Sequence, residues 1–89
     1  MQDNNTTLNA LVGQRLLNIR TSMHLSQDEF GKLVGLHRTY IGQIERADKN
    51  VSIKTIEQIC NAINTDVKDF FDFSNLKWWN LLPSFFLFY

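Results

Sequence analysis

The chain lacks several features that define other classes of protein. Its 89 residues include one cysteine and one proline, so an internal disulfide is excluded. The first ten residues, MQDNNTTLNA, have neither the basic start nor the apolar segment of a secretory signal peptide. The apolar run 80–89 is shorter than the ~20 residues that cross a bilayer. These absences predict a small cytoplasmic protein without a membrane anchor.

Motifs for catalysis are also absent. His24 and His37 are far apart in the sequence, and no Cys, His or Asp cluster has metal-ligand spacing. No glycine-rich phosphate loop, nucleophile motif or H-E-x-x-H is present. Asp28 and Glu29 are neighbours and would point in different directions on a helix. The sequence therefore predicts no enzyme, no metal, no cofactor and no small-molecule ligand.

The charge balance is unusual for a protein that binds nucleic acid. Nine Lys and Arg residues oppose nine Asp and Glu residues, and the formal net charge is zero, whereas nucleic-acid-binding domains are often basic. The distribution is uneven, however. Residues 31–54 contain five basic and two acidic residues, a net +3, and residues 66–89 carry a net −1. A local basic face is therefore expected on a neutral protein.

The most informative stretch is residues 26–45, SQDEFGKLVGLHRTYIGQIE. Ser26 followed three residues later by Glu29 is a capping box, which starts a helix. Gly35 ends this helix, because glycine enters the left-handed conformation without a Cβ penalty. The inward stripe of this helix is expected to be Phe30, Leu33 and Val34.

A second helix is predicted to begin near His37. Its inward positions are Tyr40 (in part), Ile41 and Ile44, and its outward positions are His37, Arg38, Thr39, Gly42 and Gln43. Two short helices joined by a turn containing glycine fit the DNA-binding helix-turn-helix. Arg pairs with guanine, Gln with adenine, and Thr bonds a base or touches a thymine methyl. Arg38, Thr39 and Gln43 are therefore candidate base-reading residues.

The other segments also have helical patterns. Residues 8–22 place Leu8, Leu11 or Val12, Leu16 and Ile19 on one face. Ser52 caps a predicted helix over 53–64 with the inward stripe Ile56, Ile59, Cys60 and Ile63. Asp66 caps a fifth helix with Val67, Phe70 and Phe71 on its apolar side. No β alternation or internal repeat is present, so the prediction is an all-α bundle of five helices over residues 8–73, followed by an aromatic extension over 74–89.

Residues 11–73 resemble the Cro and repressor class of helix-turn-helix regulators, the XRE family, whose fold is the lambda-repressor-like DNA-binding domain. LHRTYIGQIER with the later NVSIKTIEQICNAI is most similar to controller proteins of bacterial restriction–modification systems. Such proteins are small homodimers that bind operator DNA. The resemblance covers about seven tenths of the chain.

The resemblance implies roles for individual residues. Arg38, Thr39 and Gln43 match base-reading positions. The expected contacts to the DNA backbone are Gln27, His37, Tyr40, Arg46, Lys49 and Asn50. Arg20 and Glu45 match a structural salt bridge. Ala47 departs from the family pattern, because many relatives have glycine after the Glu-Arg pair. Alanine tolerates a positive φ poorly, which leaves the end of this helix open.

The C-terminal segment holds nine of the eleven aromatic residues between positions 70 and 89. So much apolar surface indicates an interaction site or a core, because large exposed patches mark contacts. We expect Phe70, Phe71 and Phe73 to close the core in part. A homodimer interface is predicted from Phe70, Phe73, Leu76, Trp78 and Trp79, since Trp and Phe are typical anchors. The last seven residues match no family pattern.

Together these observations predict a sequence-specific, dimeric DNA-binding transcriptional regulator that acts on a roughly palindromic operator in double-stranded DNA. Within this family, the favoured prediction is a controller protein of a restriction–modification system. The alternative is an antitoxin-like or other protein-interaction module, in which the fold is a scaffold and the aromatic segment is the working surface.

Overall fold

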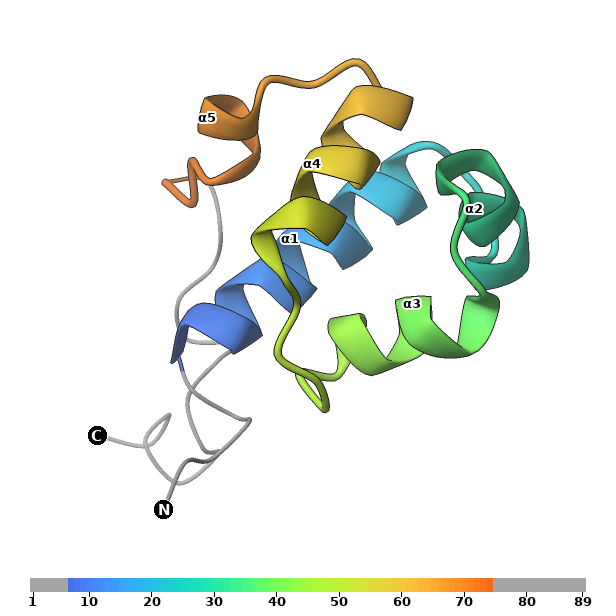
Figure 1. The fold of residues 1–89 in the computed structure, drawn as a ribbon, viewed down its shortest axis with the longest axis horizontal. Coiled ribbons are helices and arrows are strands. Elements are labelled where there is room, and N and C mark those ends of the chain that lie inside the picture. Colours follow the sequence, from blue (N-terminus) through green and yellow to red (C-terminus); the bar gives the residue numbers. More distant parts are fainter. Residues whose placement is uncertain (1–6, 75–89) are drawn as a thin grey trace.

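The computed structural model describes residues 7–74, which form five helices and no strand. The helices are α1 (Thr7–Ser22), α2 (Gln27–Val34), α3 (Arg38–Glu45), α4 (Ile53–Ala62) and α5 (Val67–Phe70). The predicted all-α, five-helix architecture is confirmed. Helices α2 and α3 lie together at one end, and α5 lies at the other (Figure 1). No helix in this range is long and apolar enough to cross a membrane.

The turn between α2 and α3 forms as the sequence predicts. The Ser26 hydroxyl accepts from Glu29 N at 3.0 Å, and Ser26 N donates to the Glu29 carboxylate at 2.8 Å. Gly35 has a φ of 80°, and Gly35 N and Leu36 N both donate to Gly31 O at 2.8 Å. A Cβ on Gly31 would lie 2.3 Å from Leu36 O, so a side chain at this position would block the turn.

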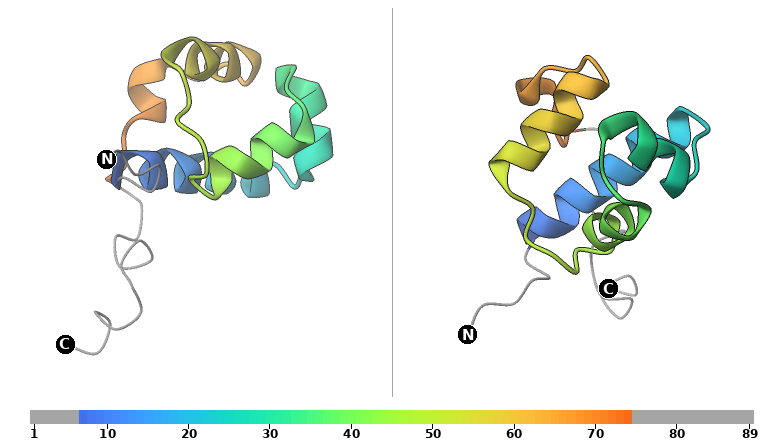
Figure 2. Two further views of the ribbon diagram at one scale, coloured as in Figure 1. Left: turned by 60° about the horizontal axis from the view of Figure 1, so that its bottom comes forward. Right: turned by 45° about the vertical axis from the view of Figure 1, so that its right-hand side comes forward.

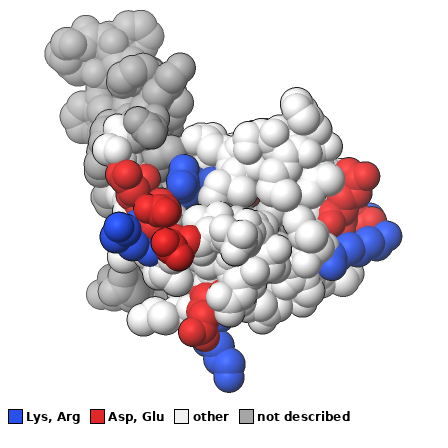
Figure 3. Space-filling model, turned by 90° about the horizontal axis from the view of Figure 1, so that it is seen from above, with Lys and Arg blue, Asp and Glu red and all other residues white. Residues whose placement is uncertain are grey.

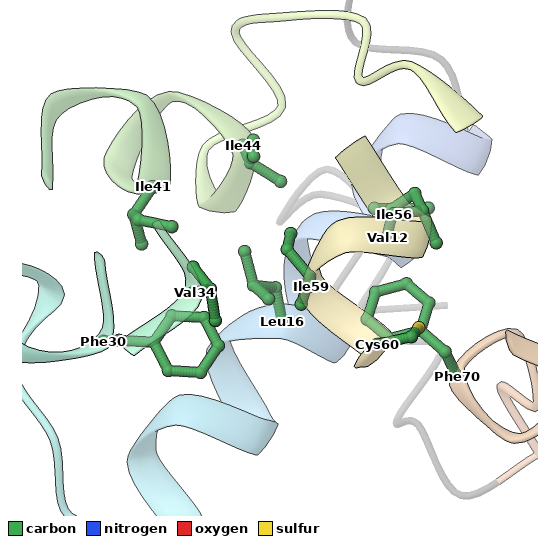
Figure 4. Close-up of a cluster of buried hydrophobic side chains, with 10 residues drawn as sticks. All are labelled: Val12, Leu16, Phe30, Val34, Ile41, Ile44, Ile56, Ile59, Cys60 and Phe70. Atoms are coloured by element: carbon green, nitrogen blue, oxygen red, sulfur yellow. The ribbon is translucent and has the colours of Figure 1, made fainter. Parts of the chain in front are cut away.

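The core joins all five helices. Leu16 and Ile59 lie near its centre, Phe30 lies on the α2 side and Phe70 on the α5 side (Figure 4). The buried cluster consists of Val12, Leu16, Phe30, Val34, Ile41, Ile44, Ile56, Ile59, Cys60 and Phe70. Its members come from the predicted inward stripes, and burying each large apolar side chain stabilises the fold by about 1.5–3 kcal/mol.

Two leucines predicted to point inward are exposed instead. Leu33 is 45% exposed, because the buried face of α2 is formed by Phe30, Gly31 and Val34 and residue 33 lies about a quarter turn from its centre. Leu8 is 58% exposed. It lies one turn before Val12, where the packing of α4 on α1 leaves a hollow.

The last two helices differ from the prediction in detail. Helix α4 ends at Ala62 rather than residue 64, and Asn64 takes a left-handed φ of 55°. Asp66 stands at the N-cap of α5, but its side chain makes no capping hydrogen bond. Phe70 is fully buried, whereas Val67 and Phe71, predicted on the same apolar side, are 43% and 37% exposed. A helix of one turn has room for one buried aromatic ring.

Candidate nucleic-acid interface

Helix α3 lies on the molecular surface, and no other helix covers it (left view of Figure 2). Ile41 and Ile44 point into the core, and Arg38 and Thr39 are exposed at the start of the helix. Gln43 is partly exposed. The three predicted base-reading residues thus lie on one helix. Arg38 and Thr39 are in its first turn, the part of a recognition helix that reaches base edges, and Gln43 is in its second half.

The start of α3 is capped by a histidine. Nδ1 of His37 accepts a hydrogen bond from Thr39 N at 3.0 Å, so the proton of the neutral ring is on Nε2. His37 is exposed, and its outward nitrogen is therefore a donor. This geometry suits the predicted contact with a phosphate oxygen, although the capping role was not predicted.

The end of α3 is fixed by an ion pair. Arg20 Nε donates to Glu45 Oε2 at 2.6 Å, and Arg20 Nη2 donates to Glu45 Oε1 at 3.1 Å. Arg20 Nη1 also donates to Leu25 O at 2.8 Å. Only 13% of the Arg20 side chain and 6% of the Glu45 side chain are exposed. The predicted pair is present, and its hydrogen bond to Glu45 raises the pKa of Arg20 above its usual range against the opposing effect of burial.

Gln27 joins this network. Its Nε2 donates to Glu45 Oε1 at 3.0 Å, so one amide hydrogen is used inside the protein. A Cβ on Gly42 would lie 3.3 Å from Gln27 Oε1 and 3.0 Å from Arg46 Nη1. Gly42, predicted to face outward, is therefore buried beneath these two side chains. Gln27 keeps a second amide hydrogen for its predicted phosphate contact.

The close approach of two helices at Gly13 was not predicted. A Cβ on Gly13 would lie 2.5 Å from Ile44 O and 2.8 Å from Glu45 O, so the backbone of α1 touches the last turn of α3. Any larger residue would push the two helices apart. A glycine inside a strongly helical pattern is the one signal that indicates such an approach.

The remaining residues predicted to contact the DNA backbone have different surroundings. Tyr40 packs partly against the core. Arg46 Nε forms an exposed ion pair with Asp48 Oδ2 at 2.9 Å. Asn50 Oδ1 accepts from Asn9 Nδ2 at 2.5 Å, which ties the loop to α1. Lys49 is exposed in the same loop and is the simplest candidate for a phosphate contact.

The charge distribution does not favour the opposite side of the molecule for DNA. On the face seen from the top of Figure 1, acidic and basic side chains lie next to one another at the margins around an uncharged centre (Figure 3).

Two further pKa shifts have structural causes. Hydrogen bonds from Ser26 lower the pKa of Glu29, and burial raises the pKa of the Cys60 thiol, which keeps it protonated and unreactive.

The residues predicted to form a homodimer interface are described by the structure only in part. Phe70 is fully buried within one chain and has no surface left for a partner copy, whereas Phe73 is partly buried against the core. Leu76, Trp78 and Trp79 lie outside the described residues. Within residues 7–74, no three His, Cys, Asp or Glu side chains come together to hold a metal ion.

Known proteins share this fold and much of this sequence. The family model HTH_3, described as helix-turn-helix, matches residues 16–70. The control protein C.BamHI of Bacillus amyloliquefaciens is 42% identical over 67 residues, which cover 74% of this chain and 83% of that protein. The control protein C.SmaI of Serratia marcescens is 34% identical over 67 residues, covering 75% and 80% of the two chains.

A solved structure gives the same result. The restriction-modification controller protein C.AhdI of Aeromonas hydrophila superposes with a TM-score of 0.69 at 35% identity. The match covers 74% of this chain and the whole of that chain. Both the sequence and the fold are therefore similar to those of controller proteins.

Proposed function

This chain belongs to the helix-turn-helix family and is a DNA-binding transcriptional regulator, not an enzyme; from that premise we propose that it is a dimeric controller protein of a restriction–modification system. The observation that supports the proposal most directly is the structure of α3. Its first turn exposes Arg38 and Thr39, and its last turn is held by the buried side of Glu45.

In the proposed mechanism, each protomer places α3 in a major groove. Arg38 pairs with guanine O6 and N7, Gln43 pairs with adenine N6 and N7, and Thr39 contacts a third base. These contacts specify the sequence, while contacts to phosphates set the position of the helix. The proposed phosphate contacts are those of Gln27, His37, Tyr40, Arg46, Lys49 and Asn50.

A dimer would bring two copies of α3, and so two sets of base contacts, to the DNA. Two copies of α3 about 34–36 Å apart would read two half-sites one helical turn apart, so the operator would be roughly palindromic. We propose that Phe73, Leu76, Trp78 and Trp79 contribute to the surface between the copies. Because the regulator must reach its operator DNA, we place it in the cytoplasm.

The test is a fluorescence-anisotropy titration with DNA from the promoter of the protein's own gene. We expect saturable, sequence-dependent binding near physiological salt, and two protomers per operator in sedimentation of the complex. Absence of sequence-dependent binding would favour the interaction-module alternative. Sedimentation that shows only monomer at high concentration would remove the dimer.

The phosphate contacts can be tested through salt. Lys49→Ala should weaken binding similarly on all sequences and reduce the salt slope by about one unit, because one fewer counterion is released. Lys68→Ala is the matched control, since Lys68 is on α5, at the end of the molecule far from α3 (Figure 1). An unchanged slope in Lys49→Ala would remove this residue from the interface.

A further inference from the structure

Gly42 is buried although it lies on the outward side of α3. The helical period places it one turn from Arg38 and one turn from Arg46, which are both exposed. The atoms that cover it are the tips of two polar side chains. A Cβ on Gly42 would lie 3.0 Å from Nη1 of Arg46, 3.3 Å from Oε1 of Gln27 and 3.4 Å from Nε2 of Gln27. The guanidinium of Arg46 and the amide of Gln27 therefore converge on this one position.

A carboxylate holds each of these two tips. Gln27 Nε2 donates to Glu45 Oε1 at 3.0 Å, and Arg46 Nε donates to Asp48 Oδ2 at 2.9 Å. Among residues 7–74 these are the hydrogen bonds that the two tips form. They leave the second amide hydrogen of Gln27 and the Nη hydrogens of Arg46 for a ligand. The two side chains are thus oriented before any ligand arrives.

The donors suit an anion that has several oxygens. A guanidinium recognises phosphate through paired N–H groups, and the Gln27 amide adds a neutral donor beside it. Glu45 opposes an anion only weakly, because it is almost fully buried and its charge is balanced by Arg20. The pair of Arg46 with Asp48 is exposed on both sides and therefore contributes little energy of its own.

The position of the two tips selects the source of the phosphate. They lie on α3 itself, on the helix that exposes Arg38 and Thr39. Gln27 belongs to the first turn of α2, and Arg46 follows the last residue of α3. A phosphate of the DNA backbone bound here would be held from two helices at once, which fixes the rotation of α3 in the groove.

We propose that Gln27 and Arg46 form a single site for one phosphate of the operator, and that Gly42 is the positioning residue that lets them meet. The inference rests on the proposed function, because it gives two separately assigned phosphate contacts a common ligand. It adds that their effects on binding are coupled. It also gives Gly42 a role in DNA affinity that is distinct from stability.

Gly42→Ala tests the positioning role. Alanine is a better helix former than glycine, and the atoms that its methyl would meet are the ends of flexible side chains. The urea midpoint should therefore stay the same or rise. Operator binding should nevertheless weaken about tenfold, a loss typical of a charge-assisted hydrogen bond, because the methyl pushes the two tips apart. A merely structural role would lower the urea midpoint together with the affinity.

The double variant Gln27→Ala with Arg46→Ala provides the control for this substitution. Adding Gly42→Ala to it should produce no further loss of affinity, because the methyl has no tips left to displace. An equal loss in both backgrounds would overturn the positioning role, since the methyl would then act on the DNA directly. Unchanged binding by Gly42→Ala in the native background would overturn it as well.

The shared phosphate can be located with operator duplexes that carry one uncharged methylphosphonate at each backbone position in turn. Gln27→Ala and Arg46→Ala should each be less sensitive than the native chain at the same position, and equally sensitive elsewhere. Lys49→Ala is the matched control, because Lys49 is not among the residues nearest to Gly42, and it should change the sensitivity at another position. Altered sensitivity at two different phosphates would overturn the single site and leave the proposed function intact. Failure of the native chain to bind DNA in a sequence-dependent way would instead overturn the proposed function.

Discussion

The two ends of α3 are built in opposite ways. At its first turn, Arg38 and Thr39 are exposed and the only cap is the His37 ring, which accepts one backbone hydrogen bond. At its last turn, Glu45 accepts three hydrogen bonds from Arg20 and Gln27. The backbone of α1 approaches the same turn at Gly13.

The difference shows how a short helix presents side chains without a large core beneath them. Eight residues form a helix that is marginal alone in water, so its orientation must come from tertiary contacts. The last turn, at Glu45, is the locked end and sets the orientation of the helix. The first turn, at Arg38 and Thr39, is the free end and carries side chains proposed to contact bases. Stability and specificity should therefore be separable by substitutions at the two ends.

Arg20→Met should have the largest effect, because it breaks the locked end. Removing one partner of a buried pair leaves Glu45 charged without its counter-ion, which costs about 3–5 kcal/mol. That is a large share of the 5–15 kcal/mol typical of a domain. Urea denaturation followed by circular dichroism measures the loss.

The double variant Arg20→Met with Glu45→Leu should recover much of this stability, because no buried charge remains. A cost below about 1 kcal/mol for Arg20→Met alone would mean that the pair behaves like an exposed one. The two ends of α3 would then differ less than their geometry suggests.

Arg38→Ala tests the free end. The loss of a bidentate contact should weaken operator binding by about 1–3 kcal/mol and relax specificity at one base pair. The urea midpoint should not change, since the side chain is exposed. Anisotropy titrations against operators altered one base pair at a time make the measurement. Equal weakening on every sequence would reassign Arg38 to a phosphate contact.

Local rules predicted the helix-turn-helix well because its signals are short-range. The capping box of Ser26 and Glu29, the left-handed Gly35 and the cap of Ser52 are all formed, and each depends on residues within four positions. The buried stripes of α3 and α4 follow from periodicity alone. The ion pair of Arg20 with Glu45 came from family resemblance, since nothing local connects residues 25 positions apart.

The other contacts between distant segments were not predicted. The approach of Gly13 to α3 and the exposure of Leu8 depend on how α1 meets elements far along the chain, and the position of Gln27 over Gly42 depends on how α2 meets α3. Periodicity states which face of a helix is apolar, but not where its packing partner ends. Leu8 is on the apolar face of α1 and is exposed because its partner leaves a hollow there.

Ala47→Gly should give a smaller effect of opposite sign at the locked end. Ala47 has a φ of 60°, a conformation that costs a residue with a Cβ about 1–2 kcal/mol. Glycine removes that strain but loses a buried methyl worth about 0.8 kcal/mol and some entropy. With the strain at the upper end of its range, a net gain of about 0.5 kcal/mol in the free energy of unfolding is expected from urea titration.

Gly35→Ala is the reciprocal test, because Gly35 has a φ of 80° after α2. It should destabilise the fold by about 1 kcal/mol, since alanine is poorly compatible with a positive φ. If both substitutions change the free energy of unfolding in the same direction, the positive φ of Ala47 does not lower the stability of the fold.

The smallest effect concerns the capping box, which fixes the helix that precedes the turn. Hydrogen bonds from Ser26 hold the pKa of Glu29 below its ordinary value of 4.5, so Glu29 stabilises the folded state fully above the unfolded pKa and loses this contribution as pH falls through the folded pKa. Glu29→Gln keeps the geometry, because Gln also completes a capping box, but it cannot titrate. The difference in melting temperature between native chain and variant should therefore be largest near neutral pH and shrink below pH 4.5. A constant difference across that range would show that the charge of Glu29 does not contribute, and that the box acts through hydrogen bonding alone.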